Sequence, residues 1–398
     1  MQIDTDKNKI REILSRGVDK VVPSGLLEKQ LLSGKRLKLY LGIDPTGTIL
    51  HLGHSIPLRK LKAFQALGHE VVLLIGDFTA KIGDPTDKLA TRQPLTDKQV
   101  KENMRTYKKQ ASKVLDFTNI KIAYNSVWLK KLNFEKIVEI ASHFSVQRLL
   151  ERDMFAKRIK EEKNISLHEF LYPLMQGWDS VMLNVDLELA GSDQLFNAIA
   201  GRKLQEIYNH KEKSVLTFKL LSGTDGQKMS KTFGNFIALT DKPQEMFGKI
   251  MSIKDGLIKE YFELTTDLPL PEIADIINKH PNPRDQKEVL GFELVKMYHS
   301  ENEAKKAKEE FNNIFQRKGL PSQIPVFTPT ENELNILDLL FESGLAKSKA
   351  EAKRLIFGKA IAIDKQLKTD WQEIIKLNHG MIIKAGKRKF IKVKLMSS

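Results

Sequence analysis

The stretch LKLYLGIDPTGTILHLGH, residues 37–54, decides the fold of this chain. Its first seven residues alternate between apolar and polar side chains and then become apolar, as in a strand that enters a buried sheet. A Pro/Gly turn follows, and we predict a helix from His51 to about Leu67, ended by Gly68. Residues 71–76 predict a second buried strand. Because parallel strands are joined by a right-handed helical crossover, this strand–helix–strand unit predicts an α/β fold.

Later segments extend this unit into a chain of several domains. Residues 186–189 and 215–221 have the composition of two further strands. Residues 319–330 carry three prolines and few charges, which is typical of a linker. We therefore predict a Rossmann-type parallel-sheet domain at 1–238 with a helical insertion at about 91–165, an α-helical domain at 239–318, a linker at 319–332 and a small α+β domain at 333–398.

Composition restricts the class of protein. A chain of 398 residues is too long for one compact core, and 41% apolar with 29% charged residues is typical of globular proteins. The longest apolar run, residues 71–75, is far too short to span a membrane. The first ten residues lack the apolar core of a signal peptide, so we expect a cytoplasmic protein without membrane association. The absence of cysteine excludes disulfides and cysteine-ligated zinc.

The charge of the chain favours a polyanionic partner. The formal net charge is +15, and residues 333–398 hold 14 Lys and Arg against 7 Asp and Glu, a net +7. Nearly half of the excess therefore lies in a sixth of the chain. A basic domain of this kind is typical of nucleic-acid binding.

A pair of histidines lies at the predicted start of the first crossover helix. Helix N-termini offer unpaired backbone N–H groups and a partial positive charge to phosphates. His51 and His54 can donate further hydrogen bonds there, and Thr46 adds a hydroxyl donor. Gly53 has no side chain, so a flat base can approach the backbone closely. The pattern predicts a site for a nucleotide triphosphate.

A second, basic signature follows far downstream. Lys228 and Lys231 lie in a segment rich in Gly, Ser and Thr, where two ammonium groups can converge on a triphosphate as pyrophosphate leaves. Glycines at 223 and 226 suit a loop that closes over its substrate. Lys88 and Arg92 form another basic pair that we expect to cover the phosphates from the opposite side.

Three polar residues on one helix face predict a pocket. Tyr172, Gln176 and Asp179 have the spacing i, i+4 and i+7, and aliphatic residues surround them. Such a face is costly in an ordinary core. It suits a substrate that carries both a cation and a hydroxyl group.

Taken in order, these motifs identify the chain as similar to a known enzyme family. Y-x-G-x-D-P-T, H-L-G-H, I-G-D-P, Y-P-L-x-Q-x-x-D, G-S-D-Q and K-M-S-K-T follow one another across the sequence. The catalytic part resembles bacterial tyrosyl-tRNA synthetases, which are class I aminoacyl-tRNA synthetases. The tail resembles the S4 RNA-binding module that many of them carry. The resemblance spans essentially the whole chain.

The resemblance implies a role for each matching residue. Tyr40 and Asp179 would bind the phenolic hydroxyl of tyrosine, and Tyr172, Gln176 and Asp84 its ammonium group. Asp193 and Gln194 would serve the ribose and the carboxylate region, and Asn125 the pocket floor. Further ATP-binding positions implied by the family are Gly42, Asp44, Gly53, Gly191, Met229 and Ser230. RNA-binding residues in the tail would be Lys347, Lys349, Lys353, Arg354, Lys387 and Arg388.

Two short segments depart from the family pattern. Ala190-Gly191 replaces the usual pair of glycines, and Gly177-Trp178 stands where the family has a small residue followed by Tyr or Phe. Neither removes a catalytic group. Both leave the dimensions of the pocket open.

The implied activity is that of a tyrosine–tRNA ligase. Tyrosine and ATP would form tyrosyl-adenylate, and tRNA(Tyr) would accept the tyrosyl group. We expect Mg²⁺ to arrive with ATP, no tightly bound cofactor, no protein metal site, and a homodimer. Three alternatives remain: a tryptophanyl enzyme, an RNA-binding protein with an inactive site, and an adenylating enzyme that uses no tRNA. The first should lack the Tyr40/Asp179 pair, the second should lack the histidine or lysine signature, and the third would not need the basic tail.

Overall fold

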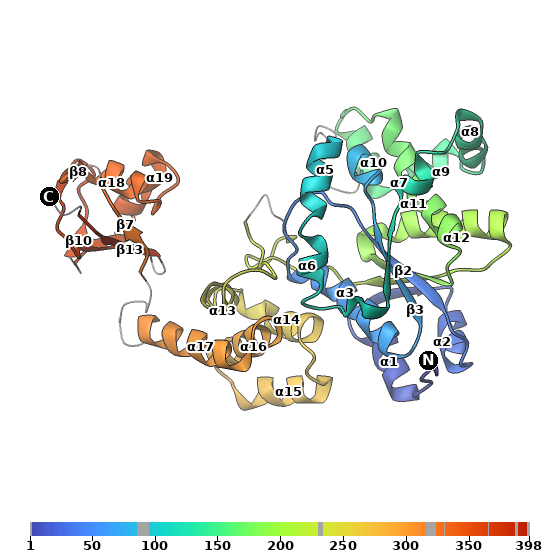
Figure 1. Ribbon diagram of the computed structural model, residues 1–398, viewed down its shortest axis with the longest axis horizontal. Helices are drawn as coiled ribbons and strands as arrows, with labels where there is room; N and C mark the ends of the chain where they lie inside the picture. Colours follow the sequence, from blue (N-terminus) through green and yellow to red (C-terminus); the bar gives the residue numbers. More distant parts are fainter. Residues whose placement is uncertain are drawn as a thin grey trace. The chain divides into compact units, whose positions relative to one another are not determined.

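The computed structural model describes residues 2–85, 95–229, 234–315, 324–329, 331–364, 366–386 and 389–395. The chain forms two compact units, residues 1–307 and 308–398 (Figure 1). The first unit thus contains the sheet and most of the predicted helical domain. The division at residue 238 stays a prediction.

A six-stranded sheet forms the centre of the first unit. Its spatial order is β1-β6-β5-β2-β3-β4, and all neighbours are parallel except β1 and β6. The predicted strands at 37–43, 71–76, 186–189 and 215–221 are confirmed as β2, β3, β5 and β6. The bounds are β1 Val18–Val22, β2 Lys38–Ile43, β3 Glu70–Ile75, β4 Ile120–Tyr124, β5 Leu187–Gly191 and β6 Ser214–Phe218.

The two edge strands were not predicted. Strand β4 lies within the segment 91–165, for which only helices were expected, and it pairs with β3. Its sequence IKIAY alternates only briefly, and its burial is partial. Strand β1 pairs antiparallel with β6 and is likewise mostly half-buried or exposed. Edge strands carry a weaker apolar pattern than central ones, and sequence periodicity misses them for that reason.

Helices cover the sheet and continue beyond it. The predicted crossover helix is α3, and residues 172–179 lie in α11 as expected. Figure 1 shows α13–α16 as a separate group of helices beside the sheet. The bounds are α1 Lys7–Ser15, α2 Leu26–Leu32, α3 Leu52–Ala66, α4 Thr79–Ile82, α5 Asp97–Met104, α6 Tyr107–Ala111, α7 Ser126–Leu129, α8 Phe134–Ser142, α9 Val146–Leu150, α10 Asp153–Lys160, α11 Leu167–Leu183, α12 Leu195–Asn209, α13 Pro243–Ile250, α14 Ile258–Thr265, α15 Leu270–Lys279, α16 Pro283–Tyr298 and α17 Glu301–Phe315, with short 3₁₀ turns at Phe117–Asn119, Ser192–Gln194 and Asp255–Leu257.

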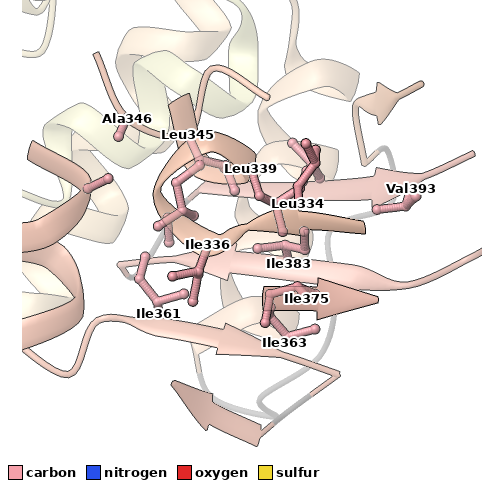
Figure 2. Close-up of a cluster of buried hydrophobic side chains, with 14 of the residues drawn as sticks. Leu334, Ile336, Leu339, Leu345, Ala346, Ile361, Ile363, Ile375, Ile383 and Val393 are labelled. Atoms are coloured by element: carbon pink, nitrogen blue, oxygen red, sulfur yellow. The ribbon is translucent and has the colours of Figure 1, made fainter. Parts of the chain in front are cut away.

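The second unit packs two helices on a small sheet. Its strands run in the order β10-β9-β12-β13-β7, and β8 pairs with β11. Figure 2 shows aliphatic side chains of α18 facing those of the strands. The bounds are β7 Val326–Phe327, β8 Glu333–Asn335, α18 Ile336–Glu342, α19 Lys349–Phe357, β9 Ile361–Ile363, β10 Gln366–Lys368, β11 Ile374–Lys376, β12 Ile382–Ala385 and β13 Lys389–Val393.

No helix in the described ranges combines the length and the apolar character needed to cross a lipid bilayer.

Candidate active site

The predicted site residues of the first unit gather at the carboxyl ends of β2, β3 and β5, where ligands of open parallel sheets bind. Asp44 follows β2, Gly76 follows β3, and Gly191 ends β5. Gly42 lies within β2 and is nevertheless exposed; the nearest atom to a Cβ built there is in the Tyr40 ring, 3.9 Å away. The sheet is therefore open above Gly42, where a flat ligand can approach the backbone.

A carboxylate cluster lies at the end of β2. Asp44 accepts hydrogen bonds from the hydroxyls of Tyr172 and Thr79, each at 2.7 Å. A Cβ at Gly76 would lie 1.8 Å from Asp44 Oδ1, so only glycine fits there. Burial raises the pKa of Asp44 to about 7. Asp44 was expected on the ATP side, yet it shares the hydroxyl of Tyr172, the predicted ammonium ligand.

Tyr40 and Asp179 are both buried at the base of the pocket. The Tyr40 hydroxyl lies 3.0 Å from Ser180 Oγ. Asp179 accepts hydrogen bonds from Trp128 Nε1 at 2.7 Å and from Asn125 Nδ2 at 3.2 Å. Burial raises the pKa of Asp179 well above its usual range. Burial and the nearby carboxylates also raise the pKa of Tyr40. These groups suit the exchange of hydrogen bonds with a hydroxyl.

A buried polar network connects this base to the rest of α11. The Gln176 amide donates to Glu188 Oε1 at 3.0 Å. Lys213 forms an ion pair with Glu188 and donates to Ser180 Oγ at 2.7 Å. Ser180 in turn contacts Tyr40. The network therefore runs unbroken from the Tyr40 hydroxyl to Gln176, and fully bonded networks of this kind hold side chains in one arrangement.

The histidine signature lies at the start of α3. The His51 backbone N–H donates to His54 Nδ1 at 3.2 Å, and the two ring centroids lie 3.9 Å apart. In the preceding turn, the Thr46 N–H donates to the Asp44 carbonyl at 2.8 Å. Both imidazoles thus lie at the helix end that attracts phosphate.

The lysine signature lies in residues 222–232, here called the lysine loop. Residues 237–239, which follow it in sequence, pair with the histidine signature. The Leu52 N–H donates to Ile237 O at 2.9 Å, and the Leu239 N–H donates to Leu50 O at 2.9 Å. A Cβ at Gly53 would lie 3.6 Å from Met229 Sδ, so Met229 packs against the histidine segment. Two signatures separated by about 175 residues are therefore neighbours.

The lysine loop also reaches the segment after β5. Lys228 Nζ lies 3.1 Å from Asp193 Oδ2. The Gln194 amide donates to Asp84 at 2.5 Å. A Cβ at Gly191 would lie 2.7 Å from Asp193 Oδ1, so a glycine lets this carboxylate turn back over the strand end. These contacts therefore connect the segment after β5 with Lys228 on one side and with Asp84 on the other.

Some predicted residues lie outside the described part of the chain. They are Lys88, Arg92, Ser230 and Lys231 of the phosphate-binding set, and Lys387 and Arg388 of the tail. Their roles stay predictions. Within the described segments, no group of three or more acidic or histidine residues is placed to hold a metal ion.

The two departures from the family pattern point away from the pocket base. Trp178 packs edge-on against Tyr208 with ring centroids 5.0 Å apart, in a cluster with residues of α7, α8 and α12. Ala190 packs against Ala198 and Val215. Gly177 lets α11 approach α12, because a Cβ there would lie 2.9 Å from Leu204.

Several site residues were not predicted from sequence. Thr79, Trp128 and Ser180 could not be found from sequence, because they occur in no distinctive motif. Glu188 did carry a signal, because it is a charge within the apolar strand β5. Arg152 is the remaining case; it lies just before α10 and is 6% exposed.

The basic face of the tail forms on α19. Lys347, Lys349 and Arg354 are exposed, while Ala352 and Ile356 point into the core. Lys349 is ion-paired with Asp338. The Lys353 ammonium lies 3.6 Å from the centroid of the Trp371 ring. Helix α19 is therefore amphipathic, and the RNA-binding role expected for its basic residues stays a prediction.

The first unit carries a second basic surface. An open cavity of about 820 Å³ is lined by cations of α3 and α6 and of the residues that follow α5 and α6. Its cationic residues are Lys62, Arg105, Lys108, Lys109 and Lys113. The opposite side of α6 contacts the turn before the histidines, because Tyr107 donates to Gly47 O and Gln110 to Thr48 O, both at 2.7 Å.

Models of two known families match the chain. Residues 32–316 match tRNA synthetases class I (W and Y), and residues 316–393 match the tyrosine–tRNA ligase SYY-like C-terminal domain. Among solved structures, the chain is similar to a C-terminally truncated mitochondrial tyrosyl-tRNA synthetase of Aspergillus nidulans, with TM-score 0.66 and 25% identity over 77% of this chain and 94% of that one. An Archaeoglobus fulgidus tyrosyl-tRNA synthetase complexed with L-tyrosine shares the fold, with TM-score 0.60, 23% identity and coverage of 76% and 98%.

Curated relatives match along almost the full length. The tyrosine–tRNA ligase of Moorella thermoacetica is 45% identical, covering 96% of this chain and 94% of its own. That of Thermotoga maritima is 45% identical, covering 98% of both. The chain therefore belongs to the tyrosine–tRNA ligase family of class I aminoacyl-tRNA synthetases.

Proposed function

We propose that this protein activates L-tyrosine with ATP and transfers it to tRNA(Tyr). The observation that carries the proposal is the burial of Tyr40 and Asp179 beside the polar face of α11. A site built to bond a substrate hydroxyl rejects the analogue that lacks it, because its own buried groups are then unpaired; tyrosyl enzymes are the known example.

In the first step, a carboxylate oxygen of tyrosine attacks the α-phosphorus of ATP. The bond from that phosphorus to the bridging oxygen breaks, and pyrophosphate leaves with the electron pair. His51 and His54 donate to the phosphates, with Thr46 in the same turn, and Lys228 neutralises the leaving group. Lys231, Lys88 and Arg92 would join them. Mg²⁺ would enter with ATP as part of the substrate.

In the second step, a hydroxyl of the terminal adenosine of tRNA attacks the tyrosyl carbonyl. AMP leaves, and no covalent enzyme intermediate is needed. Two basic surfaces support RNA as the partner, the exposed face of α19 and the cavity beside α6. Such surfaces bind folded RNA chiefly through its phosphates and shape. We place the reaction in the cytoplasm, because ribosomes consume its product there.

We also infer a homodimer. Helices α7, α8 and the start of α9 expose large apolar side chains, namely Val127 (56%), Phe134 (81%), Val138 (52%) and Val146 (62%). Neighbouring exposed apolar side chains of this size are typical of protein interfaces. Phe134→Asp is expected to shift the sedimentation coefficient from dimer to monomer, whereas Phe357→Asp in the second unit should not.

The experiment for the activity is ATP–pyrophosphate exchange with each of the twenty amino acids supplied separately. Exchange that depends on tyrosine, followed by charging of tRNA(Tyr), supports the proposal. Exchange with tryptophan would replace the substrate but keep the class. Exchange without tRNA charging would favour adenylation alone. No exchange from folded protein would leave RNA binding as the function.

A further inference from the structure

Arg152 is a buried cation without an acceptor in the described part of the chain. It is 6% exposed, and its terminal nitrogens Nη1 and Nη2 have no hydrogen-bond partner there. Its guanidinium carbon lies 4.8 Å from the ring centroid of Phe196 and 5.5 Å from that of Phe155. The rings shield the side chain, yet they satisfy none of its N–H groups.

Two residues of the predicted ammonium site lie within electrostatic range of this cation. Asp84 and Tyr172 both act electrostatically on Arg152. Both are already engaged, because Asp84 accepts from the Gln194 amide and Tyr172 donates to Asp44. Burial lowers the pKa of the guanidinium, but arginine stays protonated in proteins. Arg152 is therefore a permanent, buried positive charge whose two terminal nitrogens lack an acceptor among the described residues.

A buried charge without acceptors is strongly unfavourable in a finished structure. Buried polar groups that lack partners are rare, and functional sites are one place where they occur. A guanidinium presents two parallel N–H groups that match a carboxylate. The missing partner is therefore a planar anion.

We propose that Arg152 binds the carboxylate of the amino-acid substrate. This inference rests on the proposed function. In an amino acid, the ammonium and the carboxylate are attached to the same carbon. Arg152 packs on Phe196, two residues after Gln194, and lies within electrostatic range of the expected ammonium ligands Tyr172 and Asp84, so it is placed to reach the carboxylate.

The test compares tyrosine with tyramine, which lacks only the carboxylate. Dissociation constants are measured by calorimetry for the full-length protein and for Arg152→Gln and Arg152→Lys. Since a charge-assisted bidentate pair is among the stronger hydrogen-bonded contacts, we expect the unmodified protein to prefer tyrosine by about 10- to 100-fold. Arg152→Gln should bring that preference close to one while tyramine affinity changes less than about twofold. Arg152→Lys should retain part of the preference, because a lysine keeps the charge without the fork.

Arg148→Gln is the matched control, because Arg148 is 72% exposed and paired with Glu151. It should leave the preference unchanged. Equal loss of tyrosine and tyramine affinity in Arg152→Gln would show a structural role and overturn the proposal. A preference near one in the unmodified protein would overturn it without any variant. Failure of the proposed function appears separately, as exchange that depends on another amino acid, and the comparison is then made with that amino acid and its decarboxylated amine.

Discussion

The substrate pocket of the first unit and the core of the second unit are built from opposite kinds of side chain. The pocket buries Tyr40, Asp179, Glu188 and Lys213 almost completely. The main core cluster of the second unit consists of buried Leu, Ile, Val, Ala and Met, many of which are drawn in Figure 2. Burying polar groups costs free energy unless they are bonded. Polar burial therefore coincides with the candidate site of the first unit, whereas the second unit displays its charges on the surface.

The largest loss of stability is expected when one residue of the buried ion pair Lys213–Glu188 is replaced. Lys213→Ala leaves the Glu188 carboxylate buried without its cation, and we expect a loss of about 3–5 kcal/mol in the free energy of unfolding. Urea unfolding measures this value. Lys213→Met combined with Glu188→Gln should recover much of the loss, because no charge is then left alone. A single variant that costs less than about 1 kcal/mol would contradict the role of the network.

Cavity formation is the corresponding change in the second unit. Leu339 is fully buried in an aliphatic cluster, so Leu339→Ala should cost about 2–5 kcal/mol. Hydrogen–deuterium exchange should speed up in peptides of residues 331–393 and stay unchanged in the sheet of the first unit. Tyrosine-dependent pyrophosphate exchange should not change. Faster hydrogen–deuterium exchange in β2 or β3 would show that the stability of the first unit depends on that of the second.

The raised pKa of Asp44 predicts a pH dependence that the variant Asp44→Asn can assign to the pocket. Its folded pKa of about 7 lies above its usual value, so the folded protein keeps a proton that the unfolded chain loses. The stability from that proton is complete below about pH 4 and is lost as the pH rises to about 7. Asp44→Asn should therefore gain stability relative to the unmodified protein between pH 5 and pH 8.

Tyrosine binding should remove the proton that Asp44 keeps in the folded protein. A bound ammonium group favours the ionised carboxylate of Asp44, so binding at pH 6.5 should release a proton. Calorimetry in two buffers with different ionisation enthalpies detects the release. It should disappear in Asp44→Asn. Release that persists in this variant would assign the proton to another group.

The sequence predicts some parts of the pocket and not others. What decides is how far apart along the chain the contacting residues lie. Strands β2 and β3 and helix α3 follow from local periodicity, and the face of Tyr172, Gln176 and Asp179 follows from helical spacing. The contact of Tyr172 with Asp44 spans 128 positions, and local patterns do not encode it. The same holds for Lys213 and Glu188, which meet only because β5 and β6 are neighbours. The second unit was easier to predict, because an aliphatic core with a basic surface needs no such pairing.

Surface charges should give the smallest and most selective effects. Lys108→Glu on α6 and Arg354→Glu on α19 should each weaken tRNA binding several-fold and lower the slope of log affinity against log salt by about one. Pyrophosphate exchange, which needs no tRNA, should stay unchanged. Filter binding over a range of salt concentrations measures the slope. An unchanged slope for one variant would remove that surface from the RNA contact.

The most direct test of the central claim is the ratio of kcat/KM for tyrosine to that for phenylalanine in pyrophosphate exchange, measured for the unmodified protein and for Tyr40→Phe. If the buried hydroxyl and carboxyl groups are there to bind the substrate hydroxyl, the unmodified protein should favour tyrosine by several orders of magnitude. Tyr40→Phe should then reduce the ratio by about 10-fold or more, because one polar partner is gone. Equal use of both amino acids by the unmodified protein, or a ratio that Tyr40→Phe leaves unchanged, would contradict the account.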